Sequence, residues 1–151
     1  MKVSKRAILT GLAVSVFAFL SWFLGHVFDY DEVTRDTEYA NLAGEKFKIE
    51  KEIVAVGVTM DQNYQGDADR IYLKKIGSSG PQVKFRQPIS EGVLKIVRVH
   101  KEKWFIGDGI YYRVEYDGAI DLPKLPIYLR VTESIKSENL GLDPKLYKHL
   151  Q

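Results

Sequence analysis

The sequence predicts a single N-terminal transmembrane helix, then a small all-β barrel that ends in a short C-terminal helix. Two observations support this fold class: an uncharged apolar run covers residues 7–28, and from residue 47 onward apolar and polar residues alternate. The run is long enough to span a bilayer, and the alternation is typical of half-buried strands. We therefore divide the chain into a basic tip and anchor at 1–28, a tether at 29–44 and a barrel domain at 45–151.

The apolar run predicts an uncleaved signal anchor. A helix over 7–28 would be about 33 Å long, and such a length crosses the hydrocarbon core. The alternative is a cleaved signal peptide, but only Ser15 and Ala18 offer small residues ahead of a cut, which would leave an apolar terminus. Small residues recur along one face of this helix and predict packing against another helix, including self-association: Gly11, Ser15, Ala18 and Gly25.

Charges flanking the run predict the orientation and exclude one class of partner. Lys2, Lys5 and Arg6 precede the run and all 20 acidic residues follow it, so the N-terminus is expected in the cytoplasm and the domain in the periplasm or outside the cell. The rest of the chain has 19 cationic against 20 acidic residues. Without an excess of positive charge to displace counterions, nucleic acid is not an expected partner.

Residue types that the sequence lacks limit the cellular compartment and the chemistry that we expect of this protein. The chain has no cysteine, which excludes disulfides, a thiolate nucleophile, cysteine-ligated zinc and an acylated lipoprotein anchor. It also has no N-x-[ST] glycosylation sequon. Together these absences favour a single-pass protein in the inner membrane of a bacterial envelope.

The part after the run is expected to be rich in β-strands. The tether contains one apolar helical turn, expected to begin near residue 36 and to stop at Gly44. A change of apolar parity within 93–99 predicts a β-bulge, and the sequence GDG at 107–109 predicts a hairpin. Asp143 and Pro144 are suitable as the N-cap and first residue of a terminal helix. The expected strands are a long one at 47–58, bent at 51–52, and shorter ones at 71–76, 83–85, 93–99, 110–116 and 127–131.

Five or six short strands with little helix favour a compact barrel over a larger sandwich. An SH3-like barrel is the first expectation, because a long first strand and a turn-rich loop precede a tight meander. An OB-like barrel is the second.

Aromatic residues suggest a contact face. Trp104, Tyr111 and Tyr128 have the strand parity or loop position to point away from the core, and Arg113 and Arg130 lie near them in sequence. Rings with a polar end beside arginines are typical of surfaces that bind a protein or a sugar polymer. The alternative is that these rings only cover the barrel.

A loop of oxygen-bearing residues resembles the first half of a calcium loop, with candidate ligands Asp61, Asn63, Asp67 and Asp69. Tyr72 occupies the twelfth position, where a calcium loop needs glutamate, and strands are expected on both sides. A solvated loop is therefore the better interpretation. The three histidines lack ligand spacing, and neither a metal nor a cofactor is expected.

No catalytic motif is present in the sequence. The GSSG segment at 77–80 fits neither a nucleophile elbow nor a phosphate loop. Scattered carboxylates leave a hydrolase as a weak alternative, with Glu91, Glu102, Asp108 and Glu115 as candidate acids.

We expect a non-catalytic, membrane-anchored binding module of the envelope. Its expected partners are the membrane and another envelope protein, which it would serve as an accessory or assembly subunit or as an immunity-type inhibitor. The alternative is a module that binds peptidoglycan or another carbohydrate, for which exposed aromatic rings are required.

Overall fold

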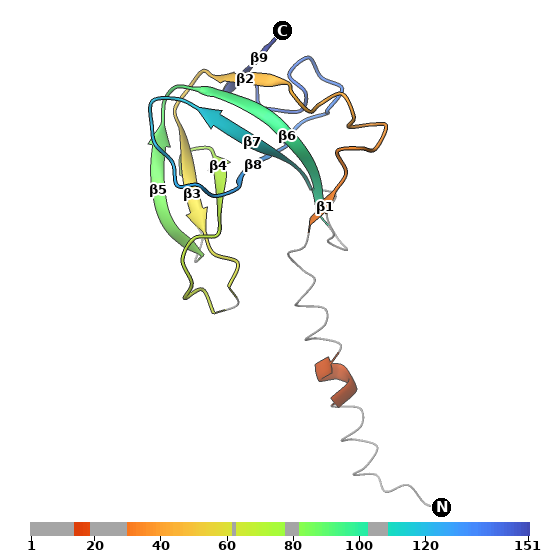
Figure 1. The fold of residues 1–151 in the computed structure, drawn as a ribbon, viewed down its shortest axis with the longest axis vertical. Helices are drawn as coiled ribbons and strands as arrows, with labels where there is room; N and C mark the ends of the chain where they lie inside the picture. The colour runs from red at the N-terminus through yellow and green to blue at the C-terminus, as the bar shows by residue number, and fades with distance from the viewer. Residues whose placement is uncertain (1–13, 19–29, 62, 78–81, 103–108) are drawn as a thin grey trace, which may run out of the picture.

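The period-two alternation produces nine β-strands in the computed structural model (Figure 1), which describes residues 14–18, 30–61, 63–77, 82–102 and 109–151. The strands are β1 (Tyr30–Glu32), β2 (Lys46–Ile49), β3 (Ile53–Val58), β4 (Arg70–Lys74), β5 (Val83–Ile89), β6 (Val93–Glu102), β7 (Ile110–Asp117), β8 (Ile127–Arg130) and β9 (Tyr147–Leu150).

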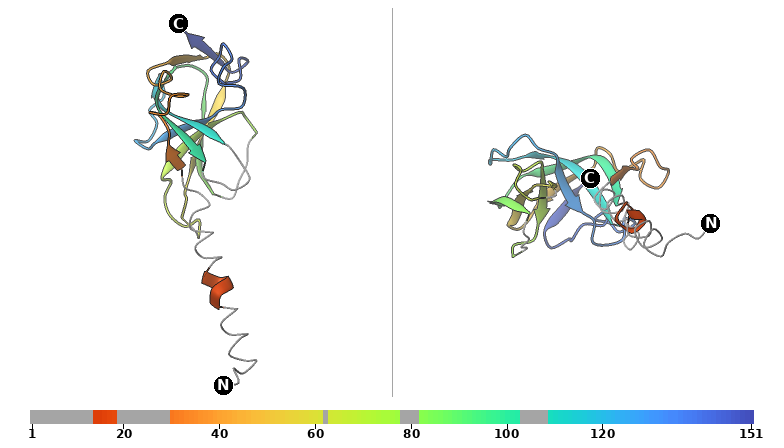
Figure 2. Two further views of the ribbon diagram at one scale, coloured as in Figure 1. Left: turned by 90° about the vertical axis from the view of Figure 1, so that its right-hand side faces the viewer. Right: turned by 90° about the horizontal axis from the view of Figure 1, so that it is seen from below.

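The strands form one sheet in the order β5-β3-β4-β8-β7-β6-β2-β9, and β1 pairs with the far end of β6. Neighbours are antiparallel except β4 and β8, which are parallel. The predicted hairpin is confirmed to the extent that β6 and β7 pair along their length; its turn lies outside the described residues. Figures 1 and 2 place β9 and the C-terminus at the end of the domain away from β1.

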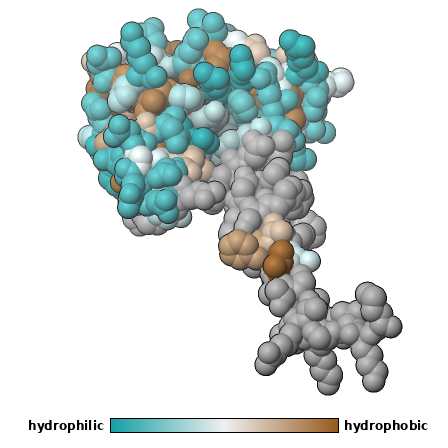
Figure 3. Space-filling view, turned by 60° about the horizontal axis from the view of Figure 1, so that its bottom comes forward, coloured by the Kyte–Doolittle hydropathy of each residue, from teal (hydrophilic) through white to brown (hydrophobic). Residues whose placement is uncertain are grey.

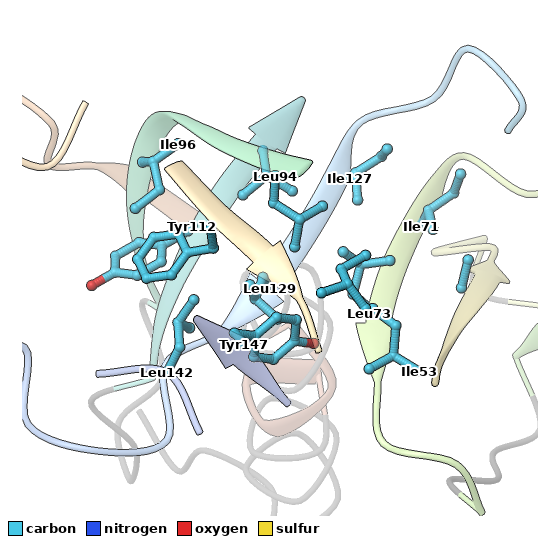
Figure 4. Packing of buried hydrophobic residues seen from close by; sticks show 14 of the residues in the cluster. Ile53, Ile71, Leu73, Leu94, Ile96, Tyr112, Ile127, Leu129, Leu142 and Tyr147 are labelled. Atoms are coloured by element: carbon cyan, nitrogen blue, oxygen red, sulfur yellow. The ribbon is translucent and has the colours of Figure 1, made fainter. Parts of the chain in front are cut away.

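One face of the curled sheet encloses the core. Alternate residues of β2 to β9 point into a shared cluster, where Phe47 and Tyr112 are fully buried. Figure 4 shows Tyr112, Leu129 and Tyr147 converging there from three strands. Because burying apolar side chains is the main driving force of folding, this core fixes which face of each strand points inward. We call the opposite face of the sheet the outer face.

The predicted bulge in the sixth strand is confirmed. The register between β6 and β7 shifts between Ile96 and Arg98, so Val97 is the extra residue. One inserted residue reverses the parity of everything after it. Ile96 and Val99 therefore both face the core, whereas His100 lies on the outer face.

The predicted fold class is wrong in its first element, the N-terminal transmembrane helix. Within this region the structure describes residues 14–18, which are helical. Among the described residues, no helix is long and apolar enough to cross a membrane. Of the predicted helix-packing residues, Ser15 and Ala18 belong to this segment, and Gly11 and Gly25 lie outside the described residues.

The predicted closed barrel is also wrong. Instead of five or six strands closing on one another, nine strands form an open sheet whose end strands, β5 and β9, do not pair with each other. The sequence signals missed β1 and β9, which are only three and four residues long. They also missed the parallel pairing of β4 with β8, because strand direction leaves no local pattern in the sequence.

The predicted C-terminal helix is a strand. Asp143 does begin a turn as expected: its side chain accepts the Lys145 N–H at 2.9 Å, and its carbonyl accepts the N–H groups of Leu146 and Tyr147. The turn goes no further, because the next residues pair with β2, with His149 opposite Phe47. Strand pairing satisfies the backbone groups that a helix would otherwise have satisfied.

The tether forms consecutive turns. The N–H groups of Asp36, Tyr39, Leu42 and Glu45 each donate to the carbonyl three residues earlier. Tyr39 and Leu42 are buried against the core, so this segment belongs to the domain. Gly44 ends the series with a φ of 98°, a conformation that glycine adopts without steric cost.

Asn139 caps the open edge of β9. Its side-chain amide donates to the Tyr147 carbonyl at 3.1 Å, and its side-chain oxygen accepts the His149 N–H at 3.0 Å. These are the two contacts that a residue of a neighbouring strand would make. An unpaired strand edge invites association with other chains, and this side chain occupies it.

Asn139→Ala should therefore lower the free energy of unfolding by about 1–3 kcal/mol, because it leaves backbone groups of β9 without partners. Chemical denaturation followed by tryptophan fluorescence measures this loss. Asn41→Ala is the matched control, since Asn41 is exposed in the turn segment. Equal stability of the two variants would show that Asn139 does not secure β9.

Candidate functional site

Four of the five predicted binding residues lie side by side on the outer face. Tyr111 on β7 is opposite Arg130 on β8, and Arg113 on β7 is opposite Tyr128 on β8. The strand parity that separates these residues from the core also gathers them on one surface. The fifth, Trp104, lies outside the described residues.

Strand pairing extends this group into two rows that cross the sheet. The first row runs from β5 to β6 through Arg86, Val56, Tyr72, Tyr128, Arg113 and Arg98. In the second row Val54 pairs with Lys74, and Arg130 pairs with Tyr111, which pairs with His100. Lys74 and Arg130 directly follow Leu73 and Leu129, which pair with each other. The first row therefore has two rings at its middle with arginines at both ends. In the second row Lys74 and Arg130 lie on one side of two adjacent rings, and Glu32 of β1 lies opposite the last ring.

Five rings from five strands form an aromatic cluster on the outer face, consisting of Tyr30, Tyr72, His100, Tyr111 and Tyr128. Tyr30 stacks on Tyr128 with ring centroids 5.9 Å apart and lies 5.2 Å from Tyr111. Tyr72 contacts Tyr111 and Tyr128 at 6.0 and 5.8 Å. Edge and tilted arrangements at these distances are favourable, so the rings hold one another in place.

Three members of the aromatic cluster were not predicted as binding residues from the sequence. Tyr72 could have been found, because it alternates with the buried residues Ile71 and Leu73. Finding His100 required the parity change to be placed at Val97. Tyr30 gave no signal, since its three-residue strand β1 is recognisable only through its pairing with β6.

The tyrosine hydroxyl groups of the aromatic cluster are hydrogen-bonding groups and not nucleophiles. The Tyr30 and Tyr72 hydroxyl oxygens lie 2.8 Å apart. Burial, reinforced by Tyr72, raises the pKa of Tyr30 far above its ordinary value, and burial likewise raises the pKa of Tyr111. Both phenols therefore stay protonated at neutral pH.

His100 differs from the tyrosines of the aromatic cluster in the environment of its polar atoms. Both of its ring nitrogens are buried and have no hydrogen-bond partner among the described residues. Its ring meets those of Tyr128 and Tyr30 edge-on. Burial lowers the pKa of His100; nearby Glu32 opposes this shift, and Arg113 and Arg98 add to it. The imidazole is therefore held in its neutral form.

Long cationic side chains surround the aromatic cluster. On β3 the outward valines Val54, Val56 and Val58 are at most 8% exposed, although no second layer of strands covers them. Their neighbours on β4 and β5 include long side chains with apolar stems, such as Arg86 opposite Val56. Such stems cover apolar surface and leave the charged ends in water.

The cations of the outer face differ in their pairing. Arg70 bonds to Asp69 at 2.7 Å and Arg98 to Glu32 at 2.9 Å. Among the described residues, no ion pair is formed by Lys74, Arg86, Arg113 or Arg130. Lys74 lies 5.7 Å from the centre of the Tyr72 ring, a cation–π contact. The face therefore offers cations that have not been neutralised internally.

A cleft of about 580 Å³ adjoins the aromatic cluster. Tyr30, Tyr72 and Tyr111 line one side, together with Arg130, and Tyr147 from β9 lines another. A second cleft reaches the same face, where Arg98 and Arg113 are among its lining residues.

The predicted calcium loop uses its carboxylates internally. Asp61 accepts the N–H groups of Gln65 and Gly66 at 3.1 and 3.3 Å. Asp69 accepts the Met60 N–H at 2.7 Å and pairs with Arg70. In the described part of the chain no three histidine or acidic side chains are grouped to hold a metal, and Asn63 and Asp67 join no such group.

No family model, curated protein or solved structure matches the chain. The chemistry of the outer face is therefore the basis for assigning a function.

Proposed function

We propose that this protein is a non-catalytic binding module of the bacterial envelope that holds a partner protein on its outer face. The observation that carries the proposal is the aromatic cluster, which places five rings among arginines on the sheet face opposite the core. Tyrosine and arginine are the residue types that dominate binding energy in protein interfaces. An accessory or assembly subunit, or an inhibitor of an exported toxin, requires only such a face.

The positions of the carboxylates support binding over hydrolysis. Glycosidases place their two acids about 5–9.5 Å apart. Glu115 pairs with Lys95 on β6, about seven residues and about 20 Å along the strand from Glu102. Glu91 precedes the other end of β6, and Asp108 lies outside the described residues. Glu102 and Glu115 therefore do not form a pair at catalytic separation.

Burial of the rings supports a protein partner over a carbohydrate. Stacking on a sugar needs a ring face that is open to solvent. Tyr128 is only 9% exposed, Tyr30 stacks on it, and Tyr72 is tilted against it. A surface that combines partly buried rings with arginines suits the mixed surface of a protein.

Sequence alone supports the proposed localisation of the domain in the bacterial envelope. The basic tip, the apolar run and the acidic residues after it favour an N-terminus in the cytoplasm, with the β-rich domain beyond the inner membrane. Protease added to spheroplasts should then degrade the domain, and an intact chain would contradict this location.

Tyr111→Ala should abolish recovery of a stoichiometric partner when the tagged full chain is purified from detergent-solubilised membranes. Truncating this half-buried ring removes contact area at the centre of the outer face, where losses of about 2 kcal/mol or more are usual. Tyr64→Ala is the matched control, because Tyr64 is 44% exposed in the loop between β3 and β4 and belongs to neither row of the outer face.

Either of two results would contradict the proposal. The partner could be recovered equally with both variants, or the wild-type chain could be retained on isolated cell-wall polymer with no protein partner. The second result would favour the carbohydrate-binding alternative. Circular dichroism of each variant confirms that the sheet is intact.

A further inference from the structure

Charge is unevenly distributed over the domain. Residues after the apolar run carry a net charge of −1, yet the two rows of the outer face contain five cations, namely Arg86, Arg98, Arg113, Arg130 and Lys74. Arg70 lies beside them on β4, and one acid, Glu32, lies opposite His100 at the end of the second row. Among the described residues, Arg70 and Arg98 are the two of these cations that pair with acids. A cationic face on a domain of near-zero charge selects its partner by charge.

The type of cation on the outer face further limits the chemical class of its ligand. Three of the four cations without an ion pair among the described residues are arginines: Arg86, Arg113 and Arg130. The planar guanidinium group binds a carboxylate through two parallel hydrogen bonds, which an ammonium group does not do. An arginine-rich, lysine-poor face therefore fits discrete carboxylates better than diffuse negative charge.

The spacing of these cations suits an extended segment. Arg86 on β5 and Arg113 on β7 lie in the same row, four strand steps apart, which is about 19 Å at the usual distance between strands. An extended chain covers that distance with about six residues. Tyr72 and Tyr128 lie between the two arginines, where the middle of such a segment would pass.

We propose that the outer face binds an acidic, extended segment of its partner protein, which crosses the strands from Arg86 to Arg113. This inference rests on the proposed function and specifies the chemistry of the partner. Carboxylates of the segment pair with Arg113 and Arg130 on one side of the aromatic cluster and with Arg86 and Lys74 on the other. The protonated tyrosine hydroxyl groups donate hydrogen bonds between them.

An anionic membrane is the competing occupant, and the apolar residues disfavour it. Peripheral binding to lipid needs large apolar side chains that enter the headgroup region. The exposed large apolar residues among those described are Val14, Val16, Phe17, Tyr64 and Ile76, and none of them belongs to the two rows. Figure 3 shows a mostly hydrophilic domain surface in which apolar residues form separate small patches.

Binding of a defined probe tests the proposal. The purified full chain in nonionic detergent is titrated into a fluorescein-labelled twelve-residue peptide of alternating Glu and Gly, and anisotropy is measured. A peptide with Gln in place of Glu should bind at least about tenfold more weakly, because each charge-assisted bond is worth about that factor or more. Raising the salt concentration should weaken binding of the Glu peptide.

Charge variants locate the site. Arg113→Gln combined with Arg130→Gln should weaken binding of the Glu peptide at least about tenfold. Lys124→Gln combined with Lys136→Gln removes the same charge from exposed loop positions and should leave binding unchanged. Equal weakening by the two double variants, or equal binding of the Glu and Gln peptides, would overturn the proposal.

Two further outcomes separate this inference from the proposed function. If a partner protein is recovered through Tyr111 but stays bound in 0.5 M salt and with the arginine double variant, the binding face stands and the acidic segment is refuted. If vesicles containing phosphatidylglycerol bind through Arg113 and Arg130 while the Glu peptide does not, the face binds lipid and the inference is refuted.

Discussion

Tyr112→Ala should lower the free energy of unfolding by about 3–5 kcal/mol, the usual cost of removing a buried aromatic side chain. Tyr112 is fully buried in the core, and its hydroxyl donates to the Leu140 carbonyl at 2.6 Å. It therefore secures both the sheet and the loop that leads to β9. Because small domains are stable by only about 5–15 kcal/mol, urea denaturation should show a much earlier transition.

Tyr112→Phe separates the two contributions. It keeps the ring and removes only the hydroxyl, which leaves the Leu140 carbonyl without that donor, and should cost about 1–3 kcal/mol. Leu140 has a φ of 48°, and Gly141 follows with a φ of 83°, so this hydrogen bond holds a turn in the left-handed region. If Phe proved as damaging as Ala, the cavity argument would be wrong.

The outcome for Tyr112 and Tyr111 shows what the sequence could predict. Their alternation within 110–116 placed Tyr112 toward the core and Tyr111 away from it, and the structure has them so. The bulge at Val97 was equally readable, because apolar residues change parity there. Both are local patterns of period two, which a strand imposes directly on its sequence.

The errors concern contacts between distant segments. Asp143 and Pro144 begin a turn whether or not a helix follows, and what ended the turn was the edge of β2, about a hundred residues earlier in the chain. In the same way, the pairing of β4 with β8 placed Tyr72 beside Tyr128. Local sequence carries no record of such a neighbour, so the face was predicted without Tyr72, His100 and Tyr30.

His100→Phe should stabilise the protein by about 1–3 kcal/mol at neutral pH, because it removes two buried nitrogens that lack partners among the described residues. A phenyl ring preserves the contacts with Tyr30 and Tyr128. Denaturation at about pH 7.5 measures the gain. His149→Phe is the comparison variant, because His149 makes a contact with Glu45 that Phe would lose.

The pH dependence of stability should change as well. The fold lowers the pKa of His100, chiefly by burial, from its ordinary value of 6.5. Below pH 6.5 His100 therefore binds a proton in the unfolded chain but stays neutral in the folded chain. The free energy of unfolding is fully present above pH 6.5 and falls as the pH drops toward the lowered pKa of His100. In His100→Phe this part of the acid sensitivity should disappear. An unchanged slope between about pH 7.5 and pH 5 would show that His100 is not buried as neutral imidazole.

A gain in stability would in turn bear on function. Natural domains rarely keep a buried polar group without partners unless it serves some purpose. If His100→Phe is more stable and also fails to recover the partner that wild type recovers, the imidazole is a contact group of the outer face. Its nitrogens would then be satisfied by the partner, and the instability of the free domain would be the cost of that site.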